Sequence, residues 1–114
     1  MSVLDILKII VAIATILTGL YSLVRPQAIR GFTGLVADGP RGITEIRAVM
    51  GGVFIGLGIA ALWFRDPKTY SMLAVAYLAI AIIRAISMFF DKSVESSNII
   101  SLAAEIIFII ILFL

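Results

Sequence analysis

Long apolar stretches alternate with short polar ones along the whole chain. Four stretches each approach the roughly 20 residues that a helix needs to cross the hydrocarbon core of a bilayer. They run over residues Leu4 to Val24, Thr44 to Phe64, Thr69 to Phe90 and Asn98 to Leu114. Because a helix satisfies its own backbone hydrogen bonds in lipid, the pattern predicts an all-α integral membrane protein, with residues 1–114 forming a single antiparallel four-helix bundle. The first stretch has no small-residue cleavage site before Arg25, so we expect it to be a retained span rather than a signal peptide.

The connections between these stretches differ in length. Arg65–Lys68 and Asp91–Ser97 are short, which favours antiparallel neighbours. The first connection, Arg25–Ile43, is longer and contains several glycines. Its apolar residues recur at helical spacing, at Ile29, Phe32, Leu35 and Val36. We expect either a short helix lying in the membrane interface or an irregular loop with a few buried side chains.

An even number of spans places both termini on one face of the membrane, called side A here, and the first and third connections on the other face, side B. The basic residues of side A are Lys8, Arg65 and Lys68, and those at or near side B are Arg25, Arg30, Arg41, Arg47 and Lys92. The positive-inside rule therefore favours side B in the cytoplasm and the termini outside it. We expect a multi-pass protein of the cell membrane, surrounded by membrane lipid.

Composition narrows the possible chemistry. Hydrophobic residues make up 62% of the chain and charged residues 14%, which suits lipid rather than water as the solvent. The chain has neither His nor Cys, so it lacks thiol nucleophiles, the commonest general base and the usual ligands of zinc and haem. A formal charge of +2, with scattered basic residues, does not indicate nucleic-acid binding. We therefore expect no metal site, no cofactor and no catalytic activity.

Two charged residues lie deep within predicted spans. Arg84 is seven residues before Asp91, and Glu105 is eight residues after Ser97. Two helices joined by the connection between those positions would place Arg84 and Glu105 at the same depth. Because an unpaired charge there is costly, we predict an ion pair between them.

Small residues line one face of the second predicted span. Ala48, Gly52, Gly56 and Ala60 follow Glu45 at spacings of three and then four residues, which keeps them on one side of an α-helix. This small-xxx-small ridge predicts close packing against another helix. The partner can be a helix of the same chain, of a second copy or of another membrane subunit.

Topology brings the start of the second span, the end of the third and the start of the fourth to side B. We therefore predict a polar pocket there, covered by the Arg25–Ile43 connection. Its polar residues would be Glu45, Arg47, Arg84, Glu105, Tyr77 and Ser101. The same residues could equally be separate structural pairs with no ligand.

The second span also carries a recognisable motif. The sequence from Gly42 to Gly52 contains Glu45 and Arg47 as a Glu-x-Arg pair, followed by the paired glycines Gly51 and Gly52. Together with the order of four spans, it resembles a family of small bacterial membrane proteins classed as a domain of unknown function. The resemblance implies a four-helix integral membrane fold and no particular activity.

Three functions remain open on this basis. A non-catalytic accessory subunit or helix-packing partner is favoured by the small-residue ridge and the small extramembrane parts. A small-molecule or lipid carrier, or a proton-coupled transporter, would use the intramembrane charges, although an Arg beside Glu105 favours a permanently ionised carboxylate. An intramembrane enzyme acting on lipid is the least supported, because Arg side chains beside both acids disfavour a bound divalent cation.

Overall fold

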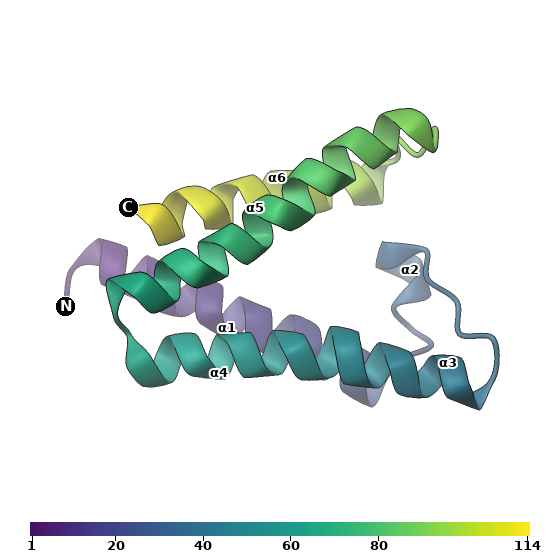
Figure 1. The fold of residues 1–114 in the computed structure, drawn as a ribbon, viewed down its shortest axis with the longest axis horizontal. Coiled ribbons are helices and arrows are strands. Elements are labelled where there is room, and N and C mark those ends of the chain that lie inside the picture. The colour runs from purple at the N-terminus through teal and green to yellow at the C-terminus, as the bar shows by residue number, and fades with distance from the viewer.

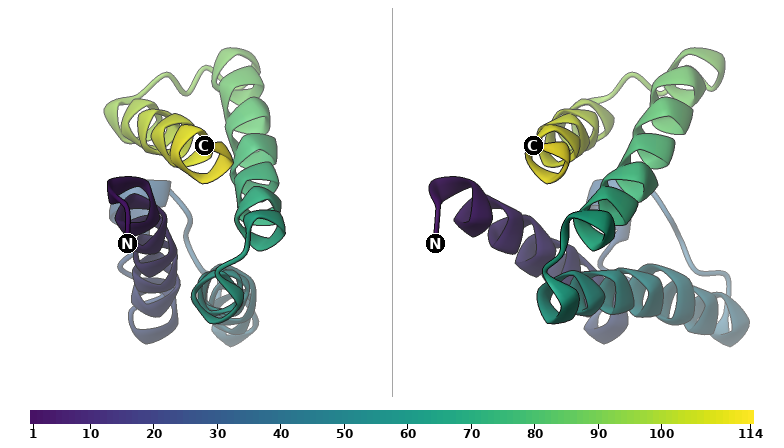
Figure 2. Two further views of the ribbon diagram at one scale, coloured as in Figure 1. Left: turned by 90° about the vertical axis from the view of Figure 1, so that its left-hand side faces the viewer. Right: turned by 60° about the vertical axis from the view of Figure 1, so that its left-hand side comes forward.

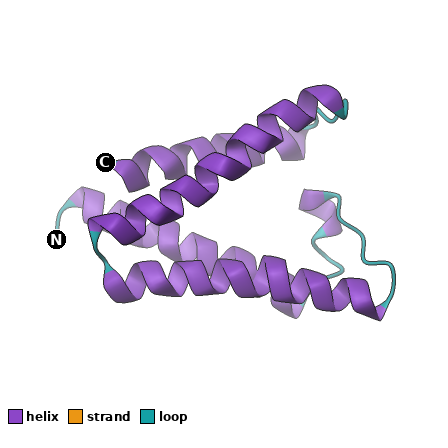
Figure 3. Cartoon of the chain, viewed as in Figure 1, coloured by secondary structure: helices purple, strands orange, loops and turns teal.

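The computed structural model describes all residues, 1–114, and consists of helices and loops without a β-strand (Figure 3). Four helical segments are long and apolar enough to cross a membrane, as predicted. In chain order the elements are α1 (Val3–Val24), α2 (Arg30–Thr33), α3 (Pro40–Glu45), η1 (Ile46–Val53), α4 (Phe54–Phe64), α5 (Pro67–Phe90) and α6 (Ser96–Phe113). The segments α3, η1 and α4 follow one another without a break and form the second span.

The long helices pack as two pairs. Helix α1 lies along η1 and α4, and α5 lies along α6. The two pairs meet near the end of the molecule that holds both termini and diverge toward the other end, where α2 lies (Figures 1 and 2). The core sits where the pairs meet and consists of Val11, Ala12, Ala61, Tyr70, Leu73, Ala74, Tyr77 and Leu112. The bundle is therefore wedge-shaped.

The outer surface of this wedge is strongly apolar. Only 19 of the 114 residues are buried, and large side chains such as Trp63 and Phe89 are more than 80% exposed, at 81% and 84%. Such a surface is stable in lipid, where apolar side chains need not be removed from water. The chain is therefore a multi-pass membrane protein.

Local capping signals set the helix ends. Helix α1 begins with a reciprocal capping box between Ser2 and Asp5. Pro40 and Pro67 occupy the first turn of their helices, where a missing N–H carries no penalty. Because Pro40 starts the second span, that helix begins four residues before the predicted start at Thr44.

The long first connection contains a short helix, which is one of the two structures expected for it. Helix α2 is only four residues long and ends at Gly34, whose φ of 76° stops the helix. Ile29 is buried, but Leu35 and Val36 lie beyond the helix and remain exposed. The helical spacing seen in the sequence therefore holds only for the first half of the apolar set.

The predicted ridge of the second span does not pack against another helix of the same chain. Ala48, Gly52 and Gly56 are exposed, and Ala60 is only partly buried. The contact with α1 instead uses Gly51, where an added Cβ would lie 3.2 Å from the Cβ of Leu23, and Gly58.

Part of this contact lies in the π-helical segment η1, in which hydrogen bonds span five residues rather than four. Ile46 and Gly51, five residues apart, are both buried. Gly51 and Gly58 are seven residues apart, which places them on one side of the span, different from the side of the exposed Gly52 and Gly56.

Candidate functional site

The predicted intramembrane ion pair is present, between α5 and α6. The Arg84 Nε donates to Glu105 Oε1 at 2.9 Å, and Arg84 Nη2 donates to Glu105 Oε2 at 2.9 Å. This two-point geometry holds both planar groups in one orientation. The Arg84 side chain is 29% exposed and that of Glu105 is 10% exposed, so the pair is partly accessible from the arginine side.

Asn98 completes this group and was not among the predicted pocket residues. Its Oδ1 accepts a hydrogen bond of 2.9 Å from Arg84 Nη1, and its Nδ2 donates to the carbonyl oxygen of Ser93. Asn98 precedes Glu105 by seven residues, which is the spacing that places two residues on one side of a helix. That spacing was the signal that could have identified it.

Tyr77 lies on the same side of α5 as Arg84. Its ring packs edge-on against Phe108, with centroids 5.3 Å apart. Its hydroxyl is hydrogen-bonded to Thr15 of α1, so Tyr77 joins one helix pair to the other. Tyr77 and Glu105 are both buried, so these two predicted pocket residues face the interior of the protein rather than lipid.

A cavity of about 410 Å³ lies between the diverging helix pairs. Four of the predicted pocket residues line it, namely Tyr77, Arg84, Ser101 and Glu105. Apolar side chains supply most of the remaining lining, from Leu35, Met50, Phe54, Ile80, Ile100 and Phe108 among others. The site therefore combines an apolar wall with a membrane-embedded ion pair.

The Arg25–Ile43 connection covers part of this cavity, as predicted. Phe32, Thr33 and Leu35 belong to its lining, and the ring of Phe32 packs against Tyr21 of α1 at a centroid distance of 5.7 Å. Figure 1 shows α2 at the open end of the wedge. The segment Phe32–Leu35 is therefore called the cover of the cavity.

The other two predicted pocket residues lie elsewhere. Glu45 is exposed and forms an ion pair with Arg41, one helical turn earlier, with 2.7 Å between Arg41 Nη1 and Glu45 Oε1. Arg47 donates from Nε to the carbonyl oxygen of Leu23 at 3.0 Å. Glu45 ends α3 and Arg47 lies in η1, and this part of the second span has separated from α5 and α6 at this end of the wedge (Figure 1). Their placement in one pocket with Arg84 was therefore wrong.

The site offers hydrogen bonding and an apolar surface. Three or more His, Cys, Asp or Glu side chains nowhere converge in a way that could hold a metal ion. Within the cavity the polar groups are the Arg84–Glu105 pair and the hydroxyls of Tyr77, Ser101, Thr18 and Thr33. Such groups can orient a ligand that also has an apolar part.

Comparison with known proteins gives one match. Neither a curated protein nor a solved structure matches the sequence significantly. The sequence model of the family described as a domain of unknown function, DUF4345, matches residues 3–114. This match covers nearly the whole chain and agrees with the resemblance carried by the second span, and the protein therefore belongs to the DUF4345 family.

Proposed function

We propose that this membrane protein binds a small amphiphilic molecule from the bilayer in the cavity between its two helix pairs. The observation that carries the proposal is an ion pair, Arg84–Glu105, lining a cavity of about 410 Å³. This volume lies within the range of roughly 300–1,000 Å³ that is typical of small-molecule sites. The activity is binding without a chemical step, in keeping with the non-catalytic role expected from the sequence.

The lining defines the class of ligand. The charges of Arg84 and Glu105 cancel, so the cavity carries no net charge that would select a strongly anionic or cationic molecule. Arg84 keeps part of its side chain accessible and can donate further hydrogen bonds from its guanidinium group. Apolar side chains around this group would hold a hydrocarbon portion. The ligand is therefore an uncharged or zwitterionic amphiphile.

A pair of adjacent alanines on α6 provides a matched test. Ala104 lines the cavity, whereas Ala103 is exposed on the outer surface. Ala104→Phe would fill the cavity without altering the ion pair, and Ala103→Phe adds the same ring facing lipid. Mass spectrometry of the purified proteins should detect a co-purifying amphiphile with the wild type and Ala103→Phe, and much less with Ala104→Phe.

The folding of each variant is checked by circular dichroism, and Ser101→Leu narrows the cavity by a smaller change. Equal amounts of amphiphile in the wild type, Ala104→Phe and Ser101→Leu would contradict the proposal. Absence of any co-purifying amphiphile from the wild type, in several mild detergents, would contradict it as well.

A second candidate function is that of a helix-packing partner or accessory subunit. It is favoured by the exposure of Gly52 and Gly56, since the contact with α1 leaves this ridge free. Close approach of another transmembrane helix would suit such a ridge. The chain has no cysteine, so Gly56→Cys can be cross-linked by oxidation in native membranes without background. A cross-linked product with Gly56→Cys, and none with Ile107→Cys on exposed α6, would support packing through the ridge.

We also infer that side B faces the cytoplasm of the cell, from the charge distribution. Val36 is exposed in the long connection on side B, and Lys68 lies between the second and third spans on side A. In intact cells, a membrane-impermeant thiol reagent should label Lys68→Cys and leave Val36→Cys unlabelled. The reverse pattern would invert the orientation.

A further inference from the structure

We propose that the protein has a second ligand site, for the phosphate group of an anionic phospholipid, formed by Arg25 and Arg47 where α1 ends. A pocket of about 410 Å³ lies at this place, distinct from the cavity between the helix pairs. Its lining consists of Val24, Arg25, Pro26, Gln27, Ala28, Ile43 and Arg47. It belongs to the α1–η1 contact and to the first turn of the long connection.

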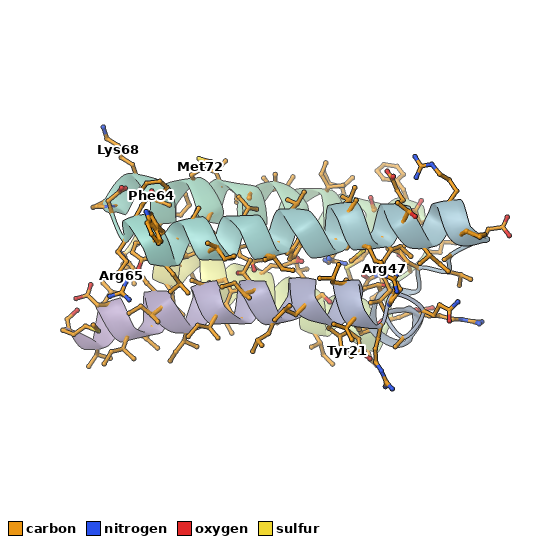
Figure 4. All side chains as sticks on the ribbon, turned by 90° about the horizontal axis from the view of Figure 1, so that it is seen from below. Tyr21, Arg47, Phe64, Arg65, Lys68 and Met72 are labelled. Carbon is orange, nitrogen blue, oxygen red and sulfur yellow. The ribbon has the colours of Figure 1, made fainter.

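The orientation of Arg47 is fixed by the protein. Its Nε donates to the carbonyl oxygen of Leu23, in the last turn of α1. Gly51 brings η1 close to α1 at Leu23 and so keeps Arg47 beside that turn. Figure 4 shows Arg47 and Tyr21 near the same end of α1. With Nε engaged, the two Nη groups remain available for a phosphate, which guanidinium groups bind at two points.

The charge of this pocket is uncompensated. The two salt bridges between side chains use Arg41 and Arg84, so neither Arg25 nor Arg47 is ion-paired. No acidic residue lines the pocket. Two positive charges without a counter-charge favour an anionic ligand, and basic pockets beside transmembrane helices are suited to anionic lipid headgroups.

The position of the pocket favours a lipid over a dissolved ion. Val24, the last residue of the α1 span, is 69% exposed and lines the pocket beside Arg25, and Ile43 contributes a further apolar side chain. Tyr21, one turn before Arg25, is 42% exposed, and tyrosines are enriched at the level of the headgroups. A phospholipid would place its phosphate between the arginines and its glycerol and acyl groups along the apolar side chains.

The test uses Arg30 as a matched control. Arg30 is on the same connection and is also free of salt bridges, but it does not line the pocket. Binding of phosphatidylglycerol to the detergent-solubilised protein is titrated by native mass spectrometry for the wild type, Arg25→Gln, Arg47→Gln and Arg30→Gln. We expect each pocket variant to weaken the affinity about fivefold, the effect of one interfacial charge, and Arg30→Gln to bind as the wild type does.

Further arms separate the possible ligands and sites. Ala104→Phe fills the cavity between the helix pairs and should leave phosphatidylglycerol binding unchanged. In that variant, phosphatidylcholine and inorganic phosphate should bind much more weakly than phosphatidylglycerol. Arg25→Gln keeps the Arg47–Leu23 bond, so its effect does not depend on a loss of structure. The proposal is overturned if Arg25→Gln binds as tightly as the wild type, if Arg30→Gln loses as much affinity, or if inorganic phosphate binds equally well.

Discussion

The phenol hydroxyl of Tyr77 lies 2.5 Å from the hydroxyl of Thr15, and this hydrogen bond joins α5 to α1. The single hydroxyl hydrogen of Thr15 is already donated to the carbonyl oxygen of Val11 at 2.8 Å. Tyr77 is therefore the donor and Thr15 the acceptor. The contact is directional, and the two partners are not equivalent.

Removing the hydroxyl of Thr15 should destabilise the protein more than removing the hydroxyl of Tyr77. Thr15→Val leaves the buried Tyr77 hydroxyl without a partner and should cost about 1–3 kcal/mol. Tyr77→Phe leaves Thr15 bonded to Val11 and keeps the ring against Phe108, so it should cost only about 0.5–1.5 kcal/mol. Thermal unfolding in detergent measures both. The double variant should be no less stable than Thr15→Val alone, and additive losses would contradict this geometry.

The Arg84–Glu105 pair should also respond asymmetrically to substitution. Replacing one partner, in Arg84→Met or Glu105→Gln, leaves a partly buried charge unpaired and should cost about 3–5 kcal/mol. Replacing both by apolar residues of similar size should be much less harmful. Asn98→Ala removes one hydrogen bond to Arg84 but keeps the ion pair, and should cost about 1 kcal/mol. Unchanged unfolding temperatures in both single variants would show that the pair does not stabilise the protein.

This pair could be predicted from the sequence because one short connection fixes the relative depth of two neighbouring helices. Counting residues from Asp91 and from Ser97 was enough to place Arg84 opposite Glu105. The partners of Glu45 and Arg47 could not be predicted in the same way. Their distance from α5 and α6 depends on the divergence of the two helix pairs, which arises from side-chain packing at the narrow end and leaves no periodic signal in the sequence.

The four spans could be predicted because the length of an apolar stretch can be read directly from the sequence. The cover of the cavity could be predicted because apolar residues recur within the long first connection. The face of the second span that contacts α1 could not be predicted in this way. Glycines lie on two sides of this span, Gly52 and Gly56 on one and Gly51 and Gly58 on the other, and their spacing alone does not decide which side contacts α1.

Two glycines of α4 test which face of the second span contacts α1, namely Gly58 on the observed contact and Gly56 on the predicted ridge. A Cβ at Gly58 would lie 2.8 Å from the carbonyl oxygen of Ala12 and would clash with the side chain of Ile16, so Gly58→Ala should cost about 1–3 kcal/mol. Gly56 has no atom within 4 Å of its Cβ position. Gly56→Ala should therefore leave the unfolding temperature of the monomer unchanged or raise it, because alanine favours the helix by about 1 kcal/mol. The opposite order of stabilities would restore the predicted ridge as the internal contact.

The carboxylate that caps the start of α5 should make the stability of the protein depend on pH. The backbone N–H of Thr69 donates to the carboxylate of Asp66 at 2.8 Å, and this bond holds the pKa of Asp66 below its ordinary value. A depressed pKa in the folded state stabilises the protein above the ordinary pKa, and this contribution is lost as the pH falls through the folded-state value. Asp66→Ala should lower the unfolding temperature at neutral pH, and the difference should shrink on acidification.

Asp66→Asn serves as the control for that measurement. Asparagine keeps an acceptor for the Thr69 N–H and caps helices well, but it does not titrate. Its unfolding temperature should lie between those of the wild type and Asp66→Ala at neutral pH. A difference between the wild type and Asp66→Ala that stays constant from neutral to strongly acidic pH would contradict the assigned role of the carboxylate.

The cover of the cavity should depend on the backbone conformation of Gly34. With φ at 76°, this residue ends α2 and directs the chain toward Leu35, and alanine in the same conformation is strained by about 1–2 kcal/mol. Gly31, within α2, also has open space around its Cβ position but no such φ, so Gly31→Ala should favour the helix. Gly34→Ala should therefore loosen the cover, and Gly31→Ala should not.

Accessibility of the cavity measures this effect directly. In the cysteine-free chain, Ser101→Cys places one thiol in the cavity lining, and its rate of labelling by a water-soluble thiosulfonate reports opening of the cover. Gly34→Ala should accelerate that labelling up to about tenfold, the effect of roughly 1.4 kcal/mol on an opening equilibrium. Gly31→Ala should leave it equal or slower, and labelling of the exposed Lys92→Cys should be the same in all backgrounds. If Gly34→Ala labels no faster than Gly31→Ala, the Phe32–Leu35 segment does not control access to the cavity.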